Sequence, residues 1–213
     1  MAKIINDEHE YSKANTSNTI TAILVKPGQI PEIIEIPNTL EAKQDIVEGY
    51  IQAIYPFEDE VAIICNDEGK TNGMPLNRAL YISGDMNVSG MEPGDIYDII
   101  AGNFLVVGIN RDNFCSLDDR LLTKYEKWYH NPEMFVFRDN KIIVLPGQPA
   151  NDDKTFKAAY CNGFKYDLSD GDMLVKPKQS NDISMDAEIK DAREVSEEIT
   201  TDTPKLPQIG KDI

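Results

Sequence analysis

The chain is short of the residues on which several common kinds of site depend. It has three cysteines, Cys65, Cys115 and Cys161, which are far apart and form no CxxC pair. A disulfide framework or a structural zinc site is therefore not expected, and we predict reduced, packed thiols. Its two histidines, His9 and His130, give poor support for a His-rich metal site or a His-dependent catalytic triad.

Long apolar runs and an excess of basic residues are also missing. No run approaches the roughly 18 consecutive apolar residues of a membrane-spanning helix, and the polar stretch 1–19 lacks the apolar core of a secretory signal. We therefore expect a cytoplasmic protein that contacts no membrane. The 21 Lys and Arg residues face 37 Asp and Glu, for a net charge of −16. Direct binding of nucleic-acid phosphates is disfavoured, because it needs clustered basic residues. The acidity serves either solubility or the binding of a basic partner.

The apolar pattern predicts more strands than helices. Strands are expected at 20–26, 31–37, 53–57, 61–65, 104–109, 135–137 and 142–145, with weaker candidates at 158–161 and 172–175. The first two strands are expected to form one hairpin, and 53–57 and 61–65 another. Turns are expected at Asp139-Asn140, Asn162-Gly163 and Asp170-Gly171. A helix is expected after Asn38, which would cap it, with Leu40, Ile46, Val47, Tyr50 and Ile51 as its apolar stripe. A second is expected after a Ser116 cap, with Leu117, Leu121, Leu122, Tyr125 and Trp128 as its stripe, ending at Asn131-Pro132.

These elements predict an α+β fold, with a small antiparallel or mixed sheet and two helices packed on one face. We expect a disordered leader at 1–19, the α+β core at 20–137, a β-hairpin-like extension at 138–177 and a disordered acidic tail at 178–213. Residues 181–213 hold nine acidic and four basic side chains. Residues 83–93 are rich in Gly, Ser, Met and Asn, which suggests a flexible insertion. Within the tail, 185–199 is at most a marginal helix.

A polar stretch between two apolar runs is the most informative feature of the chain. It extends from Asn66 to Arg78, lies between the apolar runs 61–65 and 99–108, and is rich in Asn and Gly. A rigid scaffold presents recognition loops in this way. The candidate binding residues are Asn66, Glu68, Lys70, Asn72, Asn77, Arg78 and Asp98.

The same residues also have a purely structural interpretation. Asn and Gly are turn formers, and Arg78 can simply pair with Asp98 or Glu68. We expect 78–81 to form a short helical turn. The segment Gly69–Gly73 lacks the GxxxxGK[ST] spacing of a phosphate-binding loop.

Two acidic groups have residue types that suit a metal or acid–base site. Asp95 and Asp98 are close in sequence to the polar loop, but Asp-rich turns are common. The stretch 167–172 superficially suggests a calcium loop, yet Lys178 stands where the twelfth-position Glu is needed. We predict no catalytic residues, no metal and no cofactor.

Residues 20–136 resemble an uncharacterised family, a domain of unknown function. The matching segments are Ile23–Gly28, Asn38–Glu41, Gly49–Phe57, Cys65–Leu80 with its Gly69-Lys70 and Asn77-Arg78 pairs, and Ile99–Gly108. The resemblance implies a setting in phages, plasmids and conjugative elements of Gram-positive and gut bacteria. It implies no catalytic residues.

Three functions follow as hypotheses. The preferred one is a non-catalytic accessory protein of a mobile element that binds a host or element-encoded protein, and that counteracts host defence. The second is the binding or sequestering of a small anionic ligand by Lys70 and Arg78. The third is an enzyme with an unfamiliar site built on Asp95, Asp98 and Asn77.

Overall fold

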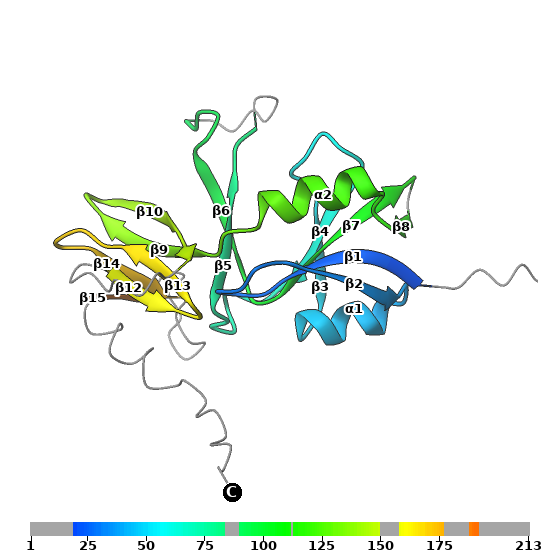
Figure 1. Ribbon diagram of the computed structural model, residues 1–213, viewed down its shortest axis with the longest axis horizontal. Coiled ribbons are helices and arrows are strands. Elements are labelled where there is room, and N and C mark those ends of the chain that lie inside the picture. The colour runs from blue at the N-terminus through cyan, green and yellow to red at the C-terminus, as the bar shows by residue number, and fades with distance from the viewer. Residues whose placement is uncertain (1–18, 84–89, 112, 150–157, 177–187, 192–213) are drawn as a thin grey trace, which may run out of the picture.

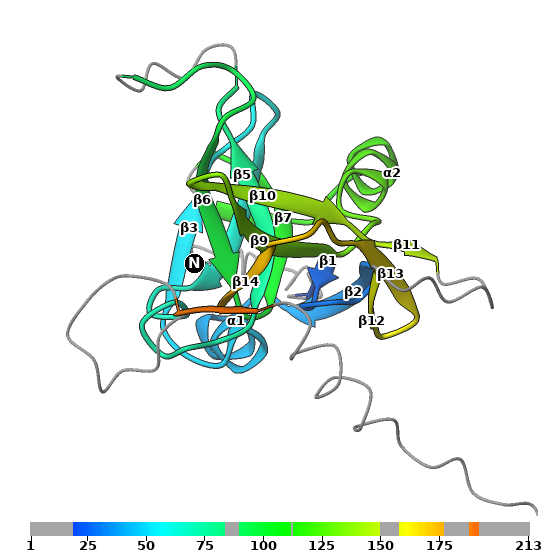
Figure 2. The ribbon, with the colours of Figure 1, turned by 90° about the vertical axis from the view of Figure 1, so that its left-hand side faces the viewer.

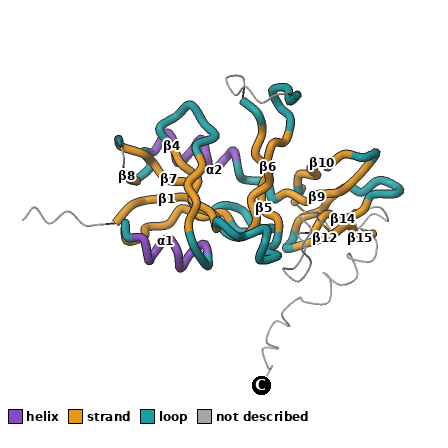
Figure 3. Tube along the Cα trace, turned by 180° about the vertical axis from the view of Figure 1, so that it is seen from behind, coloured by secondary structure: helices purple, strands orange, loops and turns teal. Residues whose placement is uncertain are grey.

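The computed structural model describes residues 19–83, 90–111, 113–149, 158–176 and 188–191. Strands dominate these residues, as Figure 3 shows. The strands are β1 (Thr19–Val25), β2 (Glu32–Pro37), β3 (Ile51–Ile54), β4 (Val61–Asn66), β5 (Leu76–Tyr81), β6 (Ile96–Ala101), β7 (Phe104–Asn110), β8 (Asn113–Cys115), β9 (Glu133–Arg138), β10 (Lys141–Pro146), β11 (Gln148–Pro149), β12 (Ala158–Cys161), β13 (Phe164–Asp167), β14 (Met173–Lys176) and β15 (Glu188–Asp191). The helices are α1 (Leu40–Val47) and α2 (Asp119–Trp128).

The first sheet is antiparallel and runs in the order β2-β1-β7-β4-β3, with β8 paired to β7 outside this path. Strand β7 lies in the middle, as its continuous apolar run predicted. The predicted hairpins β1–β2 and β3–β4 are confirmed, and Ala53 stands opposite Ile64 in the second. The sheet forms the right-hand body of Figure 1.

Each face of this sheet carries one helix, so the expected placement of both helices on one face is wrong. On one face Val25, Ile63 and Phe104 pack against Leu121 and Tyr125 of α2. On the other face Leu24, Ile64 and Leu105 pack against Val47 of α1. Successive side chains of a strand point to opposite faces, so runs that are apolar at every position bury both. Figure 1 shows α2 above the sheet and α1 below it.

The hairpin β5–β6 stands between the first sheet and the C-terminal strands (Figures 1 and 2). Leu80 and Ile100 join the apolar cluster under α2. Their neighbours Ala79 and Ile99 join Phe135 and Val175 in a separate cluster. One face of the hairpin is therefore buried against the core under α2, and the other face is buried against the C-terminal strands. The hairpin connects these two cores.

The C-terminal strands form a four-stranded sheet, β10-β9-β14-β15, and a three-stranded sheet, β11-β13-β12. The expected turn at Asp139-Asn140 is confirmed, with both residues at positive φ. The turn at Asn162-Gly163 is confirmed between β12 and β13. Strand β9 spans the predicted domain boundary between 137 and 138, and it pairs with both β10 and β14.

The predicted α+β class is therefore wrong, since the described residues are mostly strand in several separate sheets with two short helices. The expected helical turn at 78–81 is strand β5, where the polar pair Asn77-Arg78 had hidden the alternating pattern. Helix α1 ends at Val47, because Glu48 adopts a left-handed conformation. Tyr50 and Ile51 consequently do not belong to a helical stripe.

The helix caps lie close to the predicted positions but differ from them. Thr39, not Asn38, caps α1 by accepting the amide of Ala42. Asp118, not Ser116, caps α2 by accepting the amide of Leu121. Ser116 instead accepts the amide of Thr21 on β1 at 3.0 Å.

Several predictions concern residues outside the described ranges. The leader lies there except for Thr19, as does most of the 83–93 insertion. In the predicted tail, only 188–191 is described, as strand β15. Among the described residues no helix is both long enough and apolar enough to span a membrane.

Candidate functional site

The polar stretch becomes a loop, 67–75, that connects β4 to β5. Its backbone is ordered by its own hydrogen bonds, from the amide of Asn72 to the carbonyl of Glu68 and from Met74 to Gly69. Gly69 lies so close to β6 that an added Cβ would stand 2.7 Å from the carbonyl oxygen of Ala101. The loop is therefore fixed to the hairpin at one point, while Glu68 and Asn72 are exposed to solvent.

Asn66, at the start of this stretch, holds the end of α1. Its buried amide donates to the carbonyls of Val47 and Glu48 at 3.0 and 3.1 Å. Its Oδ1 accepts the amide of Glu68 at 2.8 Å. The last carbonyls of a helix have no hydrogen-bond donor within the helix, and the Asn66 amide donates to two of them here.

Asn77 and Arg78 are buried at the junction of the two cores. Asn77 is fully buried and donates to the carbonyls of Val25 and Gly102 at 3.0 and 2.7 Å. The Arg78 side chain is only 1% exposed, and it donates to the carbonyls of Gln29 and Tyr129, each at 2.9 Å. It also bonds the backbone and side-chain oxygens of Asn77. The side chains of Asn77 and Arg78 therefore stabilise the fold, and neither exposes its polar atoms to solvent.

Among the described residues, the hydrogen bonds of Arg78 go to carbonyl oxygens and not to a carboxylate. Desolvation by burial lowers its pKa, and the nearby carboxylate of Glu133 acts in the opposite direction. Burial also raises the pKa of Glu133, which accepts the amide of Ala79 at 2.7 Å. Within the part of the chain that the structure describes, the Arg78 Nε atom has no hydrogen-bond partner.

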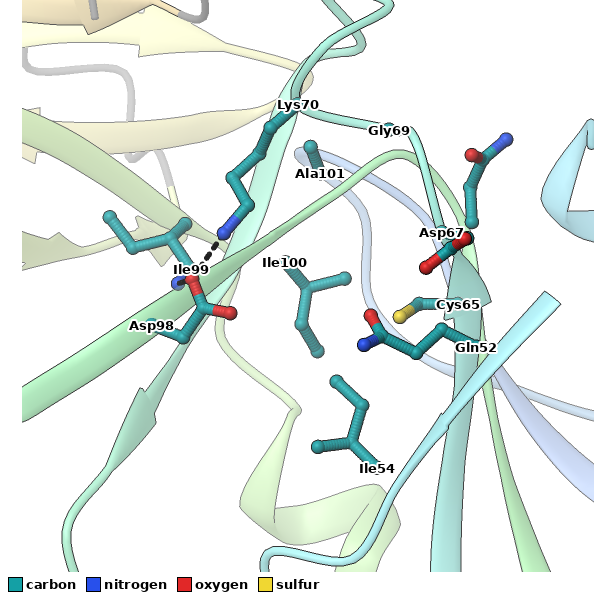
Figure 4. A pocket seen from close by; sticks show the side chains of 11 residues that line it. Gln52, Ile54, Cys65, Asp67, Gly69, Lys70, Asp98, Ile99, Ile100 and Ala101 are labelled. Carbon is teal, nitrogen blue, oxygen red and sulfur yellow. Dashed lines mark hydrogen bonds and ion pairs between the residues drawn. The ribbon is translucent and has the colours of Figure 1, made fainter. Parts of the chain in front are cut away.

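Lys70 and Asp98 form an ion pair beside a small pocket (Figure 4). Their side chains are 56% and 41% exposed, so the pair contributes no more than about 1 kcal/mol. The pocket is lined by Gln52 and Ile54 of β3, by Cys65 to Asp67 with Gly69 and Lys70, and by Asp98 to Ala101 of β6. Its volume of about 40 Å³ is far below the several hundred cubic ångströms of a typical ligand pocket.

The pocket contains no activated nucleophile. Burial raises the pKa of the Cys65 thiol to about 11, so the reactive thiolate is scarce at neutral pH. The three cysteines are free thiols. The described residues include no group of three or more His, Cys, Asp or Glu side chains placed to hold a metal ion.

The other acidic candidates also have partners inside the chain. Asp95 accepts the amide of Glu92 at 2.8 Å, which closes a turn. Asp172 accepts two hydrogen bonds from Arg138, at 2.6 and 2.7 Å, and one from the amide of Ser169. The Arg138 guanidinium lowers the pKa of Asp172. The stretch that suggested a calcium loop is thus held by an arginine.

The predicted binding residues included none from β3. Gln52 and Ile54 line the pocket, and Tyr50 and Tyr55 flank the strand with 72% and 62% of their surface exposed. The missed signal is a charge pattern: from residue 44 to 69 there is no Lys or Arg. The acidic residues in that range are Asp45, Glu48, Glu58, Asp59, Glu60, Asp67 and Glu68.

Trp128 extends the exposed aromatic surface from the neighbouring helix. It is 59% exposed and meets Phe57 edge-on, with 6.2 Å between ring centroids. The next residue, Tyr129, is buried against Phe104. Asp59 connects the β3–β4 turn to α2 through Lys124 at 2.5 Å and Tyr125 at 2.9 Å. The turn and the helix therefore hold this surface together.

Comparisons with known proteins identify the family but no activity. No curated protein and no solved structure matches the chain significantly. A family model described as a domain of unknown function, DUF3846, matches residues 20–130. This range runs from β1 to just beyond α2 and so includes the first sheet, both helices, the polar loop and the β5–β6 hairpin. The chain belongs to the DUF3846 family of domains of unknown function.

Proposed function

We propose that this protein acts by binding another protein rather than by catalysis. The observation that carries the proposal is that Tyr50 and Tyr55, at the two ends of β3, and Trp128, which contacts Phe57, are each more than half exposed. Tyr and Trp are enriched at protein interfaces, because they bury a large area and keep a polar atom for hydrogen bonding. We call Tyr50, Ile51–Ile54, Tyr55 and Trp128 the β3 surface.

The structure favours this function over the binding of a small anion. The two cations expected to bind an anion already have partners within the chain. Arg78 donates hydrogen bonds to backbone carbonyls, and Lys70 forms an ion pair with Asp98. The pocket that Lys70 lines holds about 40 Å³, and Arg78 does not line it. A nucleotide or metabolite needs a larger pocket.

The partner in this proposal is a host or element-encoded protein. The chain resembles a protein family that occurs in phages, plasmids and conjugative elements, and this resemblance supports a setting in a mobile element. A bacterial defence protein is the partner that such a setting favours, and the acidity of the chain suits a partner with a basic surface. Fold and family alone do not specify a partner, so the proposal depends on the β3 surface.

A pull-down from bacterial lysate with mass-spectrometric readout tests the proposal. Wild type is compared with a Tyr50→Ala, Tyr55→Ala double variant. The matched control is Ile33→Ala, Ile142→Ala, which removes two exposed apolar side chains from other strands. We expect a partner that wild type and control retain and the tyrosine variant loses. Enrichment of no protein by wild type would overturn the proposed function.

A further inference from the structure

The two edges of the first sheet differ in how they are protected against pairing with another chain. Strand β2 forms one edge and β3 the other. Pro31 and Pro37 stand at the two ends of β2, and Glu32 and Glu35 are exposed along it. Proline removes a donor and charged side chains disfavour pairing, so both features protect an edge strand.

Strand β3 lacks the prolines and charged side chains that protect β2. Its four residues, Ile51, Gln52, Ala53 and Ile54, include no charge and no proline. Among the described strands β3 pairs only with β4. One backbone edge is therefore open, at the outer margin of the sheet, as Figure 2 shows. Such an edge is a template for one further strand.

The acidic side chains near β3 favour a positively charged segment as the strand that pairs with this edge. Asp67 lies in the pocket beside Gln52 and Ile54, and the next residue, Glu68, is exposed. Asp98 also lies beside Gln52 and Ile54 in the pocket, and its partner Lys70 is held only by an exposed ion pair. A Lys or Arg side chain of an incoming strand can replace Lys70 there. A second copy of this chain would instead bring the same acidic residues against themselves.

We propose that an extended segment containing Lys or Arg, from a partner protein, pairs with the β3 edge as an additional strand. Main-chain hydrogen bonds supply the affinity in such strand addition, and neighbouring side chains supply the specificity. Tyr50 and Tyr55 cover the two ends of the added strand, and the acidic residues attract its basic side chains. This inference rests on the protein-binding function proposed above.

A designed peptide tests the pairing directly. The probe is a fluorescently labelled ten-residue peptide that alternates Lys with Val or Thr. Its first control has the same sequence but N-methylated amides at alternate residues, which keeps the charge and removes donors. Its second control replaces each Lys with Glu. Binding is measured by fluorescence anisotropy, and its place by amide NMR shifts.

The basic peptide is expected to bind and to shift the amides of Ile51–Ile54. N-methylation weakens binding by about tenfold or more, since strand addition depends on backbone bonds. The Glu peptide does not bind. Equal binding of the methylated peptide, shifts confined to other strands, or no binding of the basic peptide would each overturn strand addition at β3.

Matched variants of the protein give a second readout. Gln52→Lys adds a repelling charge to the β3 edge, and Ile33→Lys adds the same charge to the β2 edge. Only Gln52→Lys is expected to abolish peptide binding. A concentration-dependent dimer that Gln52→Lys abolishes would identify a second copy as the occupant and overturn the basic partner.

The same variants separate the failure of this inference from that of the proposed function. If lysate proteins bind wild type and Gln52→Lys equally, protein binding stands and the β3 edge is not its site. If wild type binds neither a lysate protein nor the peptide, both proposals fail.

Discussion

Arg78 connects three segments that are far apart in the sequence. Its guanidinium on β5 donates to the carbonyl of Gln29, after β1, and to that of Tyr129, at the end of α2. It is the largest of the fully buried side chains. The sequence could indicate that Arg78 is important, but not that its partners are carbonyls, because those contacts join residues about fifty positions apart.

Replacing Arg78 is expected to destabilise the fold. Arg78→Met leaves the buried carbonyl of Tyr129 and the partly buried carbonyl of Gln29 without this donor, so the free energy of unfolding should fall by about 3 kcal/mol or more. Arg78→Lys should also destabilise it, because an ammonium group does not reproduce the planar fork. Urea unfolding measures the change. Arg111→Met, on an exposed arginine, is the control and should stay within about 0.5 kcal/mol of wild type. Unchanged stability in Arg78→Met would contradict the structural role.

The stability of the fold is expected to depend on pH through Asp172. The hydrogen bonds of Arg138 lower its pKa below the ordinary value of 3.8. A group with a depressed pKa in the folded state stabilises that state above the unfolded pKa, and this contribution is lost as pH falls through the folded pKa.

The unfolding free energies of wild type and Asp172→Asn are therefore expected to differ most above about pH 5. The difference should shrink as pH falls below about 4. Arg138→Met should remove the same acid-dependent part of the stability. Urea titrations between pH 2.5 and 7 measure all three proteins. If the difference in unfolding free energy between wild type and Asp172→Asn instead increased as the pH fell, the prediction would be contradicted.

At the scale of elements, Asn66 couples the end of α1 to the start of the polar loop. Its amide stands 2.6 Å from where a Cβ on Gly49 would lie. Gly49→Ala therefore requires Asn66 to move from the carbonyls of Val47 and Glu48. Gly49, which follows the end of α1, is therefore required by packing.

A double-mutant cycle should reveal this coupling. Asn66→Ala and Gly49→Ala should each lower the free energy of unfolding by about 1–3 kcal/mol. Together they should cost less than their sum, by about 0.5 kcal/mol or more, because the side chain that clashes is already gone. Urea unfolding of the four proteins measures the cycle. Strict additivity would show that the two residues do not interact.

Predicted elements agreed with the structure where local signals were strong. The continuous apolar run of β7 and the turn at Asp139-Asn140 were recognisable from residue types alone. Strand β5 was not, because Asn77 and Arg78 are polar and nevertheless buried. Only partners from other segments make that burial favourable.

At the scale of the whole molecule, ending the chain at residue 180 tests how much the last described strand contributes. This truncation removes β15, which pairs with β14 in the C-terminal sheet. Melting should remain cooperative, because the first sheet, its two helices and the two apolar clusters that join them all lie before residue 180. The midpoint should fall by about 2–4 °C for each kcal/mol of lost pairing. Calorimetry measures both. Loss of a cooperative transition would show that the core depends on residues after 180.

The sequence by itself determined the acidity, the strand-rich pattern and the position of the polar loop, since these depend on composition and short-range periodicity. Only the tertiary structure decided that the helices cover opposite faces and that Arg78 faces inward. It also decided that β3 lies at an edge of the sheet. The physical reason is that burial and strand order depend on contacts between distant segments, which local patterns do not specify.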